Sequence, residues 1–253
     1  MRVVAIIPAR YSSTRLPAKP LQKLGRKSII EWVYEAVSGA VADVFVATDD
    51  ERIAQEVARF GGRAIMTSTS LRSGTDRCAE ALDKIEARYD VVINVQGDEP
   101  FIRREHIETL LACFKHADTE IATLAKPFTE EDGINSLLNS NNVKVVVGDA
   151  GRALYFSRSP IPYLRDVRAE EWLNDHTYLK HLGIYAFRAS VLRAVTRLES
   201  TPLERAERLE QLRWLEHGYR ITVAETEYAS IGIDTAEDLQ RAEEFINSGL
   251  WRE

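Results

Sequence analysis

The chain has 253 residues, of which 45% are hydrophobic and 28% are charged. This length suits one large α/β domain or two small ones, and such a chain buries a core without disulfide or metal staples. Lys and Arg number 33 against 39 Asp and Glu, which gives a formal net charge of -6. This balance argues against a general nucleic-acid-binding protein, whose surface is usually basic, but it allows a local basic pocket for a small anion.

The cysteine content and the lengths of the apolar runs indicate the cellular compartment. Cys78 and Cys113 are too few for a disulfide framework or a cysteine zinc cluster, and each falls on an apolar helical face, so we expect two buried free thiols. The apolar run at residues 3–7 is too short for a signal peptide. No stretch approaches the roughly 20 apolar residues of a membrane span. We therefore expect a cytoplasmic protein with no membrane insertion.

The first half of the chain alternates strand-like and helix-like segments. Continuous apolar runs predict buried strands at residues 3–7, 43–48 and 91–95. Apolar residues at helical spacing predict helices around residues 29–37, 53–60, 78–85 and 107–114. The alternation predicts a mostly parallel sheet with helices on both faces. Ligands bind such sheets beyond the carboxyl ends of the strands, so the loops after Ile7, Val46 and Val95 are the first places to look for chemistry.

The second half has a more mixed pattern. Strands are predicted at residues 143–147, 153–157, 182–187 and 221–224, and helices through residues 206–215 and 235–246. The polar, Asn-rich stretch 133–142 predicts a surface loop. Neither an internal repeat nor a linker is visible. We therefore predict one domain, residues 1–253, in which a β-rich region at about residues 140–190 forms a smaller insertion.

The loop after the first strand, residues 8–20, carries Arg10, Arg15 and Lys19 and is stiffened by three prolines. A polyanion such as a triphosphate needs several convergent donors, and Arg, Lys and backbone N–H groups supply them. A solvated basic turn is the alternative, but the position at a strand's carboxyl end favours anion binding. Neither of the two familiar glycine-containing phosphate motifs occurs in the chain.

Two carboxylates follow predicted strands or precede predicted helices. Asp98 comes after Gly97 at the end of the third buried strand, where it would be a hard-oxygen ligand for Mg²⁺ or a solvated turn residue. Asp234 precedes Thr235 and Asp238, which resemble a capping box. Asp234 could therefore favour a helix N-terminus or act as a second metal ligand facing Asp98. Their separation in sequence leaves both readings open.

Further polar segments suggest pocket walls. Residues 71–77 read as a turn into a helix that could contact a base, or as a purely structural turn. Arg158 ends a predicted strand and could pair a carboxylate bidentately. His181 and Tyr185 share a strand face, which is either a pocket wall or an exposed face. Most of the charge in residues 207–213 reads as the solvated face of a helix.

Taken in order, eight segments resemble the 3-deoxy-manno-octulosonate (Kdo) cytidylyltransferases, over about residues 3–239. They are IPARYSSTRLPAKPL, SGTDR, NVQGDEPFI, VKVV, YFSRSPIPY, KHLGIYAFR, LEQLRWLEHG and GIDTAEDL. The resemblance implies a Rossmann-like nucleotide-diphospho-sugar transferase fold and the reaction of CTP with Kdo to give CMP-Kdo and pyrophosphate, for lipopolysaccharide biosynthesis. It implies in-line attack of the sugar 2-hydroxyl on the α-phosphate, assisted by Mg²⁺. It also implies a homodimer to which the β-rich region contributes, with no nucleic-acid partner.

The same resemblance implies roles for individual residues. Arg10 and Lys19 would hold the triphosphate with help from Arg15, and Asp98 and Asp234 would bind Mg²⁺; Arg10, Lys19, Asp98 and Asp234 form the implied catalytic set. The cytosine and its nearby loop would contact Arg72, Ser73 and Arg77. The sugar pocket would comprise Gln96, Arg158, His181, Tyr185, Glu210 and Gln211, with Arg158 on the sugar carboxylate and Gln211 on its hydroxyls. Two departures from the family pattern are Ala18, where Gly is usual, and Leu71, where His is frequent.

Other functions would leave other marks. A cytidylyltransferase for a sialic acid would usually lack the KHLGIY and LEQLR pair, whereas 8-amino-Kdo differs from Kdo by one amine that a single pocket residue could accommodate. A glycosyltransferase would not need the triphosphate cradle of Arg10, Arg15 and Lys19. A non-catalytic nucleotide sensor would not need both Asp98 and Asp234.

Overall fold

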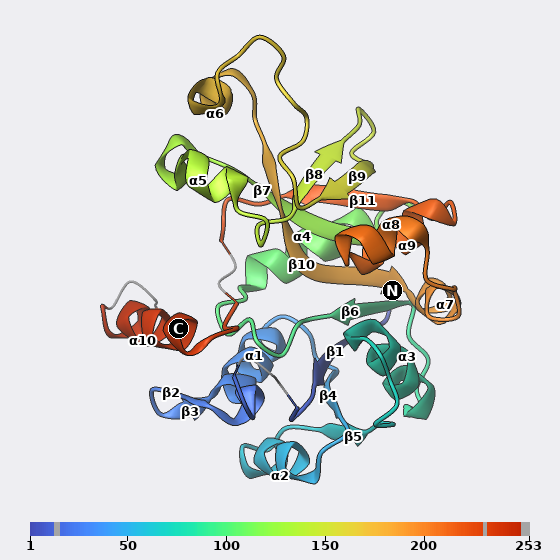
Figure 1. Ribbon diagram of the computed structural model, residues 1–253. Coiled ribbons are helices and arrows are strands. Elements are labelled where there is room, and N and C mark those ends of the chain that lie inside the picture. Colours follow the sequence, from blue (N-terminus) through green and yellow to red (C-terminus); the bar gives the residue numbers. More distant parts are fainter. Residues whose placement is uncertain (13–15, 230–231, 249–253) are drawn as a thin grey trace. The chain divides into compact units, whose positions relative to one another are not determined.

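The structure is a computed structural model that describes residues 1–12, 16–229 and 232–248 (Figure 1). The chain divides into two compact units. Unit 1 comprises Met1–Glu108 and Ser230–Glu253, and unit 2 comprises Thr109–Ala229. The division falls within helix α4 (Arg104–Cys113). This helix confirms the helix predicted at residues 107–114. The single domain expected from the sequence stays a prediction.

Unit 1 contains a parallel sheet in the order β6 (Val91–Asn94), β1 (Val3–Ala9), β4 (Val44–Thr48) and β5 (Ala64–Met66). Every neighbouring pair among these strands is parallel. The residues from Val4 to Ile7 are fully buried, as a continuous apolar run predicts. β5 escaped prediction because it has only three residues, none of them buried. The mostly parallel sheet expected from the sequence is confirmed.

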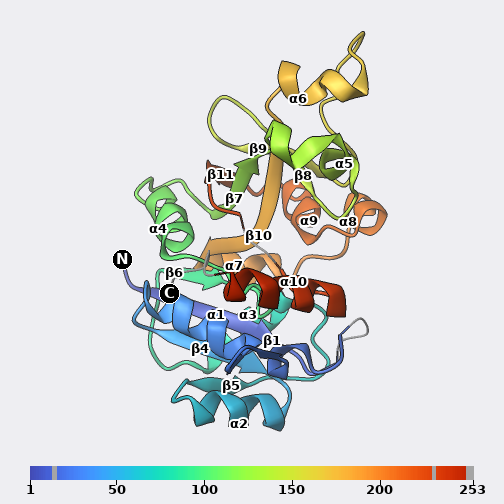
Figure 2. The same cartoon turned by 90° about the vertical axis from the view of Figure 1, so that its left-hand side faces the viewer.

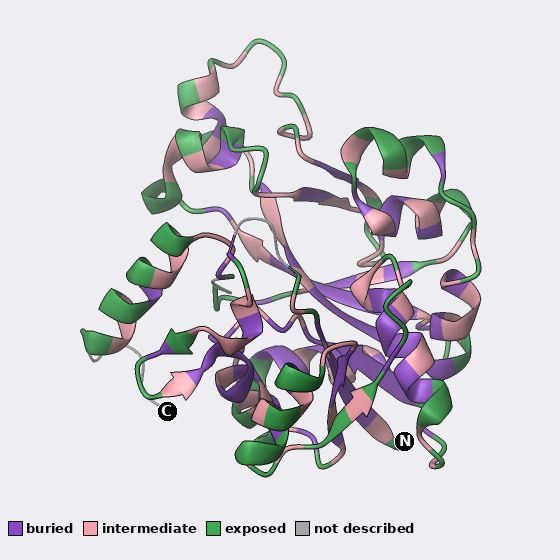
Figure 3. Ribbon diagram, turned by 60° about the horizontal axis from the view of Figure 1, so that its bottom comes forward, coloured by how far each residue is buried: buried purple, intermediate pink, exposed green. Residues whose placement is uncertain are grey.

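Three helices cover this sheet. α1 (Ile29–Ser38) and α2 (Glu51–Arg59) lie on one face and α3 (Gly74–Lys84) on the other, as right-handed crossovers require (Figures 1 and 2). Side-chain caps start two of them, since Asp50 accepts from the Arg52 N–H and Ser73 from the Asp76 N–H. Exposed residues gather on the helices while the sheet strands are mostly buried (Figure 3). The strand ends are thereby held on a rigid scaffold.

The last helix, α10 (Ala236–Asn247), packs in unit 1 on a satellite core. Ahead of α1 stand the short 3₁₀ turn η1 (Lys19–Leu21) and a hairpin of β2 (Lys23–Leu24) and β3 (Lys27–Ser28). The buried residues of this core are Leu16, Leu24, Ile29, Phe101, Ile233 and, from α10, Ala242. Thr235 and Asp238 form the complete capping box that the sequence suggested. The box fixes the residue just before it, Asp234, whose N–H donates to the Asp238 carboxylate at 3.0 Å.

Unit 2 is built on β7 (Ile121–Pro127), which pairs in parallel with β11 (Ile221–Glu225) and antiparallel with β10 (Leu179–Arg188). β10 pairs with β8 (Lys144–Val147), and β8 pairs with β9 (Ala153–Ser157), both antiparallel. These strands include the four predicted in this half of the chain. The helices of this unit are η2 (Glu130–Asp132), α5 (Gly133–Leu138), η3 (Ala169–Glu171), α6 (Trp172–Asp175), α7 (Ala189–Val195), α8 (Pro202–Glu207) and α9 (Glu210–Glu216).

Three local predictions are wrong. Residues 133–142 are not only a loop, because α5 occupies the first six and buries Leu137 against an aromatic cluster. The helix predicted through residues 206–215 is two helices, because Arg208 adopts a left-handed backbone with φ 53° between α8 and α9. Cys78 is buried as expected but Cys113 is only half-buried; both are free thiols.

No helix in the described part of the chain combines the length and apolar character needed to cross a membrane.

Candidate functional site

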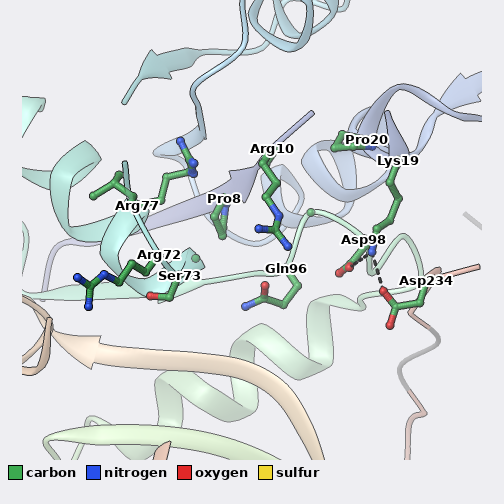
Figure 4. A pocket seen from close by; sticks show the side chains of 14 residues that line it. Pro8, Arg10, Lys19, Pro20, Arg72, Ser73, Arg77, Gln96, Asp98 and Asp234 are labelled. Carbon is green, nitrogen blue, oxygen red and sulfur yellow. Dashed lines mark hydrogen bonds and ion pairs between the residues drawn. The ribbon is translucent and has the colours of Figure 1, made fainter. Parts of the chain in front are cut away.

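A pocket of about 300 Å³ lies in unit 1 beyond the carboxyl ends of β1 and β6 (Figure 4). Its volume falls within the range of small-ligand sites. Its walls come from the loop after β1, the start of α3, the loop after β6 and Asp234. The lining residues are Pro8, Ala9, Arg10, Lys19, Pro20, Leu71, Arg72, Ser73, Gly74, Arg77, Gln96, Gly97, Asp98 and Asp234. The structure therefore brings together eight of the residues implied by the sequence.

The ammonium of Lys19 sits between two carboxylates. Nζ donates to Asp98 Oδ2 at 2.6 Å and to Asp234 Oδ1 at 2.7 Å (Figure 4). Burial opposes the charge on Lys19, but the two carboxylates outweigh this and raise its pKa above the usual value. Two carboxylates far apart in sequence thus converge on one cation.

Backbone contacts explain why these residues meet. The Ile233 N–H donates to the Asp98 carbonyl at 2.9 Å, which ties the chain before α10 to the loop after β6. Ala18 adopts a left-handed backbone with φ 52° just before Lys19. A Cβ on Gly97 would lie 2.8 Å from the Pro8 carbonyl oxygen, so only glycine allows the loops after β1 and β6 to approach this closely.

The Asp98 and Asp234 pair fits a divalent cation. Two carboxylate oxygens already converge on the positive charge of Lys19, and hard oxygen donors of this kind suit Mg²⁺, which is commonly held by one or two carboxylates plus substrate phosphates. Among the described residues, no group of three or more His, Cys, Asp or Glu side chains could form an all-protein metal site. An ion bound here would therefore need ligands from a substrate or from water.

Two arginines of the pocket have uncommitted guanidinium groups. Arg10 and Arg72 are exposed, and neither makes a hydrogen bond or ion pair to any residue that the structure describes. Figure 4 shows Arg10 entering the pocket from the β1 loop above Gln96. These side chains can bind an anion without first losing a protein partner. Arg15, the third predicted cation of this loop, lies outside the described residues.

Arg77 has a different environment from Arg10 and Arg72. Its buried guanidinium pairs with Asp49 at 2.8 Å and donates to Thr67 Oγ1 at 2.5 Å. Ser73 is likewise engaged, as the cap of α3. The contacts of Arg77 join the ends of β4 and β5 below the pocket wall, so it supports the shape of the wall. Asp49 escaped prediction, although its position directly after the strand 43–48 was a usable signal.

The remaining predicted sugar residues, Arg158, His181, Tyr185, Glu210 and Gln211, belong to unit 2. His181 Nε2 lies 3.0 Å from Thr123 Oγ1, and burial lowers the pKa of His181 to about 3, so this imidazole is neutral. The Tyr185 ring centroid is 5.4 Å from that of His181. Within the described residues the Tyr185 hydroxyl has no hydrogen-bond partner, and burial raises its pKa well above the usual value.

The other three residues lie near the break between α8 and α9. Glu210 pairs with Arg213 at 2.6 Å, and Gln211 is buried at the start of α9. The Arg158 guanidinium donates to the carbonyl oxygens of Glu207 at 2.7 Å and Ser140 at 3.0 Å. Arg158 is thus held by backbone oxygens.

A parallel sheet with a cationic, carboxylate-bearing pocket at its strand ends is typical of nucleotide-binding α/β enzymes. The family model described as "Cytidylyltransferase" matches residues 4–221. A 3-deoxy-manno-octulosonate cytidylyltransferase of Phocaeicola vulgatus is 56% identical over 97% of this chain and 98% of its own, and one of Bacteroides thetaiotaomicron is 53% identical over 98% and 99%. The solved structure of a CMP:2-keto-3-deoxy-manno-octonic acid synthetase complexed with CTP is 42% identical, with a TM-score of 0.90, over 98% of this chain and all of that one.

The protein belongs to the 3-deoxy-manno-octulosonate cytidylyltransferase family. The resemblance found in the sequence is thereby confirmed. A 4-diphosphocytidyl-2C-methyl-D-erythritol synthase of Anaerococcus prevotii shares the fold alone, at 15% identity and a TM-score of 0.63.

Proposed function

We propose that this enzyme transfers the cytidylyl group of CTP to the 2-hydroxyl of Kdo, giving CMP-Kdo and pyrophosphate. The observation that carries the proposal is the convergence of Asp98 and Asp234 on one cation beside the uncommitted Arg10, at the strand ends. Family membership supports the choice of CTP and Kdo as substrates.

On the nucleotide side, Arg10, Lys19 and Arg15 would hold the triphosphate. Phosphoryl-type transfer is mainly positioning and charge stabilisation, so cations that bind the leaving pyrophosphate lower the barrier directly. Arg72 is free to reach the nucleotide, whereas Ser73 and Arg77 would act by shaping the loop around the cytosine. Gln96, which lines the same pocket, is assigned to the sugar.

Asp98 and Asp234 would hold the divalent ion, for which we propose Mg²⁺. When bound, such an ion neutralises phosphate charge and lowers the pKa of a coordinated hydroxyl. The carboxylates themselves fix the place of that charge, because the capping box holds Asp234 and the close approach at Gly97 holds Asp98.

In unit 2, Arg158 is assigned to the sugar carboxylate and Gln211 to the sugar hydroxyls, with His181, Tyr185 and Glu210 as further sugar-binding residues. The Tyr185 hydroxyl, buried and without a partner among the described residues, is the kind of group that a bound hydroxyl would satisfy. The neutral His181 would contribute packing and one hydrogen bond, not charge.

Pyrophosphate release tests this proposal. Purified protein is mixed with CTP and Mg²⁺. Parallel reactions contain Kdo, 8-amino-Kdo or N-acetylneuraminate in addition. Release with Kdo supports the proposal. A clear preference for 8-amino-Kdo would keep the mechanism and change the substrate, and no release with any sugar would refute it.

Assembly and context are part of the proposal too. We propose a homodimer, a cytoplasmic location and a role in lipopolysaccharide biosynthesis, with neither nucleic acid nor membrane as a partner. Sedimentation equilibrium tests the dimer directly, because the dimer would have twice the mass of the 253-residue chain. Replacement of the natural gene in a cell that depends on Kdo tests the biosynthetic role.

A further inference from the structure

Unit 2 contains a fully buried lysine that the reaction does not use. Lys144 begins β8, and its side chain has no exposed surface. Buried lysines are rare unless they are paired, because removing an ammonium from water is costly. No described carboxylate lies within ion-pair distance of Lys144. A methionine would fill similar space at lower cost, so the ammonium points to a specific task.

The charge of Lys144 is satisfied by three backbone carbonyl groups. Nζ donates to the carbonyl oxygens of Asn139 at 3.0 Å, Asn142 at 2.7 Å and Arg158 at 2.7 Å. These oxygens come from two segments, the loop after α5 and the end of β9. An ammonium has three donors, so all of its hydrogen-bonding capacity is used to join these segments.

The loop after α5 and the end of α8 together hold the side chain of Arg158. Its Nη1 donates to the Ser140 carbonyl at 3.0 Å, which lies in the loop that Lys144 ties down. Its Nε donates to the Glu207 carbonyl at 2.7 Å, and Nη2 lies 3.5 Å from the Arg208 carbonyl. Lys144 therefore fixes both the backbone of Arg158 and one acceptor of its guanidinium.

Glu207 completes the arrangement from α8. Its carboxylate accepts from the Ser157 hydroxyl at 2.6 Å and from the Arg158 N–H at 3.0 Å. The end of β9 is thus clamped between a buried ammonium and a carboxylate. Charged hydrogen bonds of this kind give geometric precision as well as energy.

The guanidinium keeps donors for a ligand. It has five N–H donors, and three of them are directed at the carbonyl oxygens of Ser140, Glu207 and Arg208. The other two have no acceptor among the described residues, and the side chain is only half-buried. A planar fork with its orientation fixed and donors remaining is suited to a carboxylate.

We propose that Lys144 is a positioning residue for the acidic sugar: its ammonium holds the carbonyl cage that orients Arg158 toward the sugar carboxylate. This inference rests on the proposed function and deepens it. Orienting the guanidinium in advance saves conformational entropy when the sugar binds. Lys144 touches no substrate, and its effect is confined to sugar binding.

The test compares Lys144→Met with Lys180→Met. Lys180 lies directly opposite Lys144 in the register of β8 and β10, and its side chain makes no hydrogen bond or ion pair to a described residue. Both changes remove one positive charge from the same cross-strand pair. We expect Lys144→Met to raise the KM for Kdo at least tenfold while the KM for CTP stays within twofold, and Lys180→Met to leave both nearly unchanged.

Chemical rescue separates positioning from general damage to the fold. Lys144→Ala leaves space for n-propylammonium, which replaces the missing atoms and donors and should restore much of the affinity for Kdo. Tetramethylammonium has the same charge but no N–H donor and should not. Equal rises in both KM values, an equal effect of Lys180→Met, or rescue by both cations would overturn the proposal.

A readout without substrate keeps this test separate from that of the proposed function. Amide hydrogen exchange in residues 139–142 and 157–159 should speed up in Lys144→Met and not in Lys180→Met. Unchanged exchange would mean that Lys144 does not hold the cage. Faster exchange in a protein whose wild type shows no turnover with Kdo would instead refute the sugar assignment, and with it the proposed function.

Discussion

Lys19 offers the sharpest test of the carboxylate pair in unit 1. Lys19→Met keeps the length of the side chain but removes the cation that Asp98 and Asp234 share. Without a metal ion, two carboxylates then face each other with nothing between them. We expect the variant to be less stable than wild type in the presence of a chelator.

The size of the effect follows from the geometry. Both oxygens bond one nitrogen, at 2.6 and 2.7 Å, so they lie at most about 5 Å apart, and at an effective dielectric constant of about 20 such charges repel by about 3 kcal/mol. The side chains of Asp98 and Asp234 are 30% and 43% exposed, so solvent and salt should reduce the loss to about 1–2 kcal/mol. The triphosphate should also bind more weakly to the variant, since one of its cations is gone.

Urea unfolding with and without Mg²⁺ measures the loss of stability in Lys19→Met. A divalent ion restores positive charge between the carboxylates, so Mg²⁺ should return most of the stability lost by Lys19→Met and should stabilise wild type less, because there Lys19 competes for the same oxygens. Lys23→Met is the matched control. Lys23 is exposed and pairs with Glu56 at 3.2 Å, a surface ion pair worth about 1 kcal/mol at most and without a link to Mg²⁺.

Two results would refute the reasoning. If Lys19→Met matches wild type in chelator and gains nothing extra from Mg²⁺, the two carboxylates do not form a cation site. If Lys23→Met shows the same dependence on Mg²⁺, the ion acts on the whole surface charge and not on Asp98 and Asp234.

Three further predictions concern single side chains. Asp98→Asn should reduce turnover by at least a hundredfold while the melting temperature stays within a few degrees, measured by pyrophosphate release and thermal unfolding; a lost melting transition would make Asp98 a structural residue. Asp49→Asn should cost about 2–3 kcal/mol in urea unfolding, because it leaves the buried charge of Arg77 without its carboxylate; a change below about 0.5 kcal/mol would contradict a supporting role. His181 has a pKa of about 3 when folded against a usual 6.5, so between these values the unfolded chain takes up a proton that the folded protein does not, and stability falls as the pH falls. Relative to His181→Gln, wild type should lose about 1–2 kcal/mol between pH 7 and pH 5, and equal losses would show that His181 titrates freely.

Much of the site was predictable because the positions of the strand ends could be predicted from the sequence. Val3–Ala9 and Val91–Asn94 are continuous apolar runs, and parallel strands place their carboxyl ends at one edge. That rule puts Arg10 and Asp98 in one pocket. It also applies to Asp49, which follows β4 and was overlooked because nothing in the sequence showed that Arg77 would need a partner.

The pairing of Asp234 with Asp98 could not be derived from the pattern. The capping box at Thr235 was visible and is present, but it serves equally well at the start of any surface helix. What brings Asp234 to the site is the hydrogen bond from Ile233 to the Asp98 carbonyl, a contact between distant segments. Only the family resemblance predicted that Asp234 and Asp98 would act at the same site.

The failures in unit 2 have local physical causes. α5 has six residues and one buried side chain, too few for a helical period to be visible. Arg208 breaks a segment with good helical spacing because it takes a left-handed backbone, a conformation that favours Gly or Asn. The residue at this position is an Arg, so the sequence does not indicate a break. Nothing in the sequence marks Lys144, because its contacts are with carbonyl groups that a sequence does not place.

The most direct test of the central claim is a coupled assay of pyrophosphate release from CTP and Kdo with Mg²⁺, run on wild type and on Asp98→Asn. The account predicts rapid release by wild type that depends on both substrates and on Mg²⁺, and almost none by the variant. Release that continues without Kdo, or that survives in Asp98→Asn, would contradict the claim that this pocket activates Kdo with CTP.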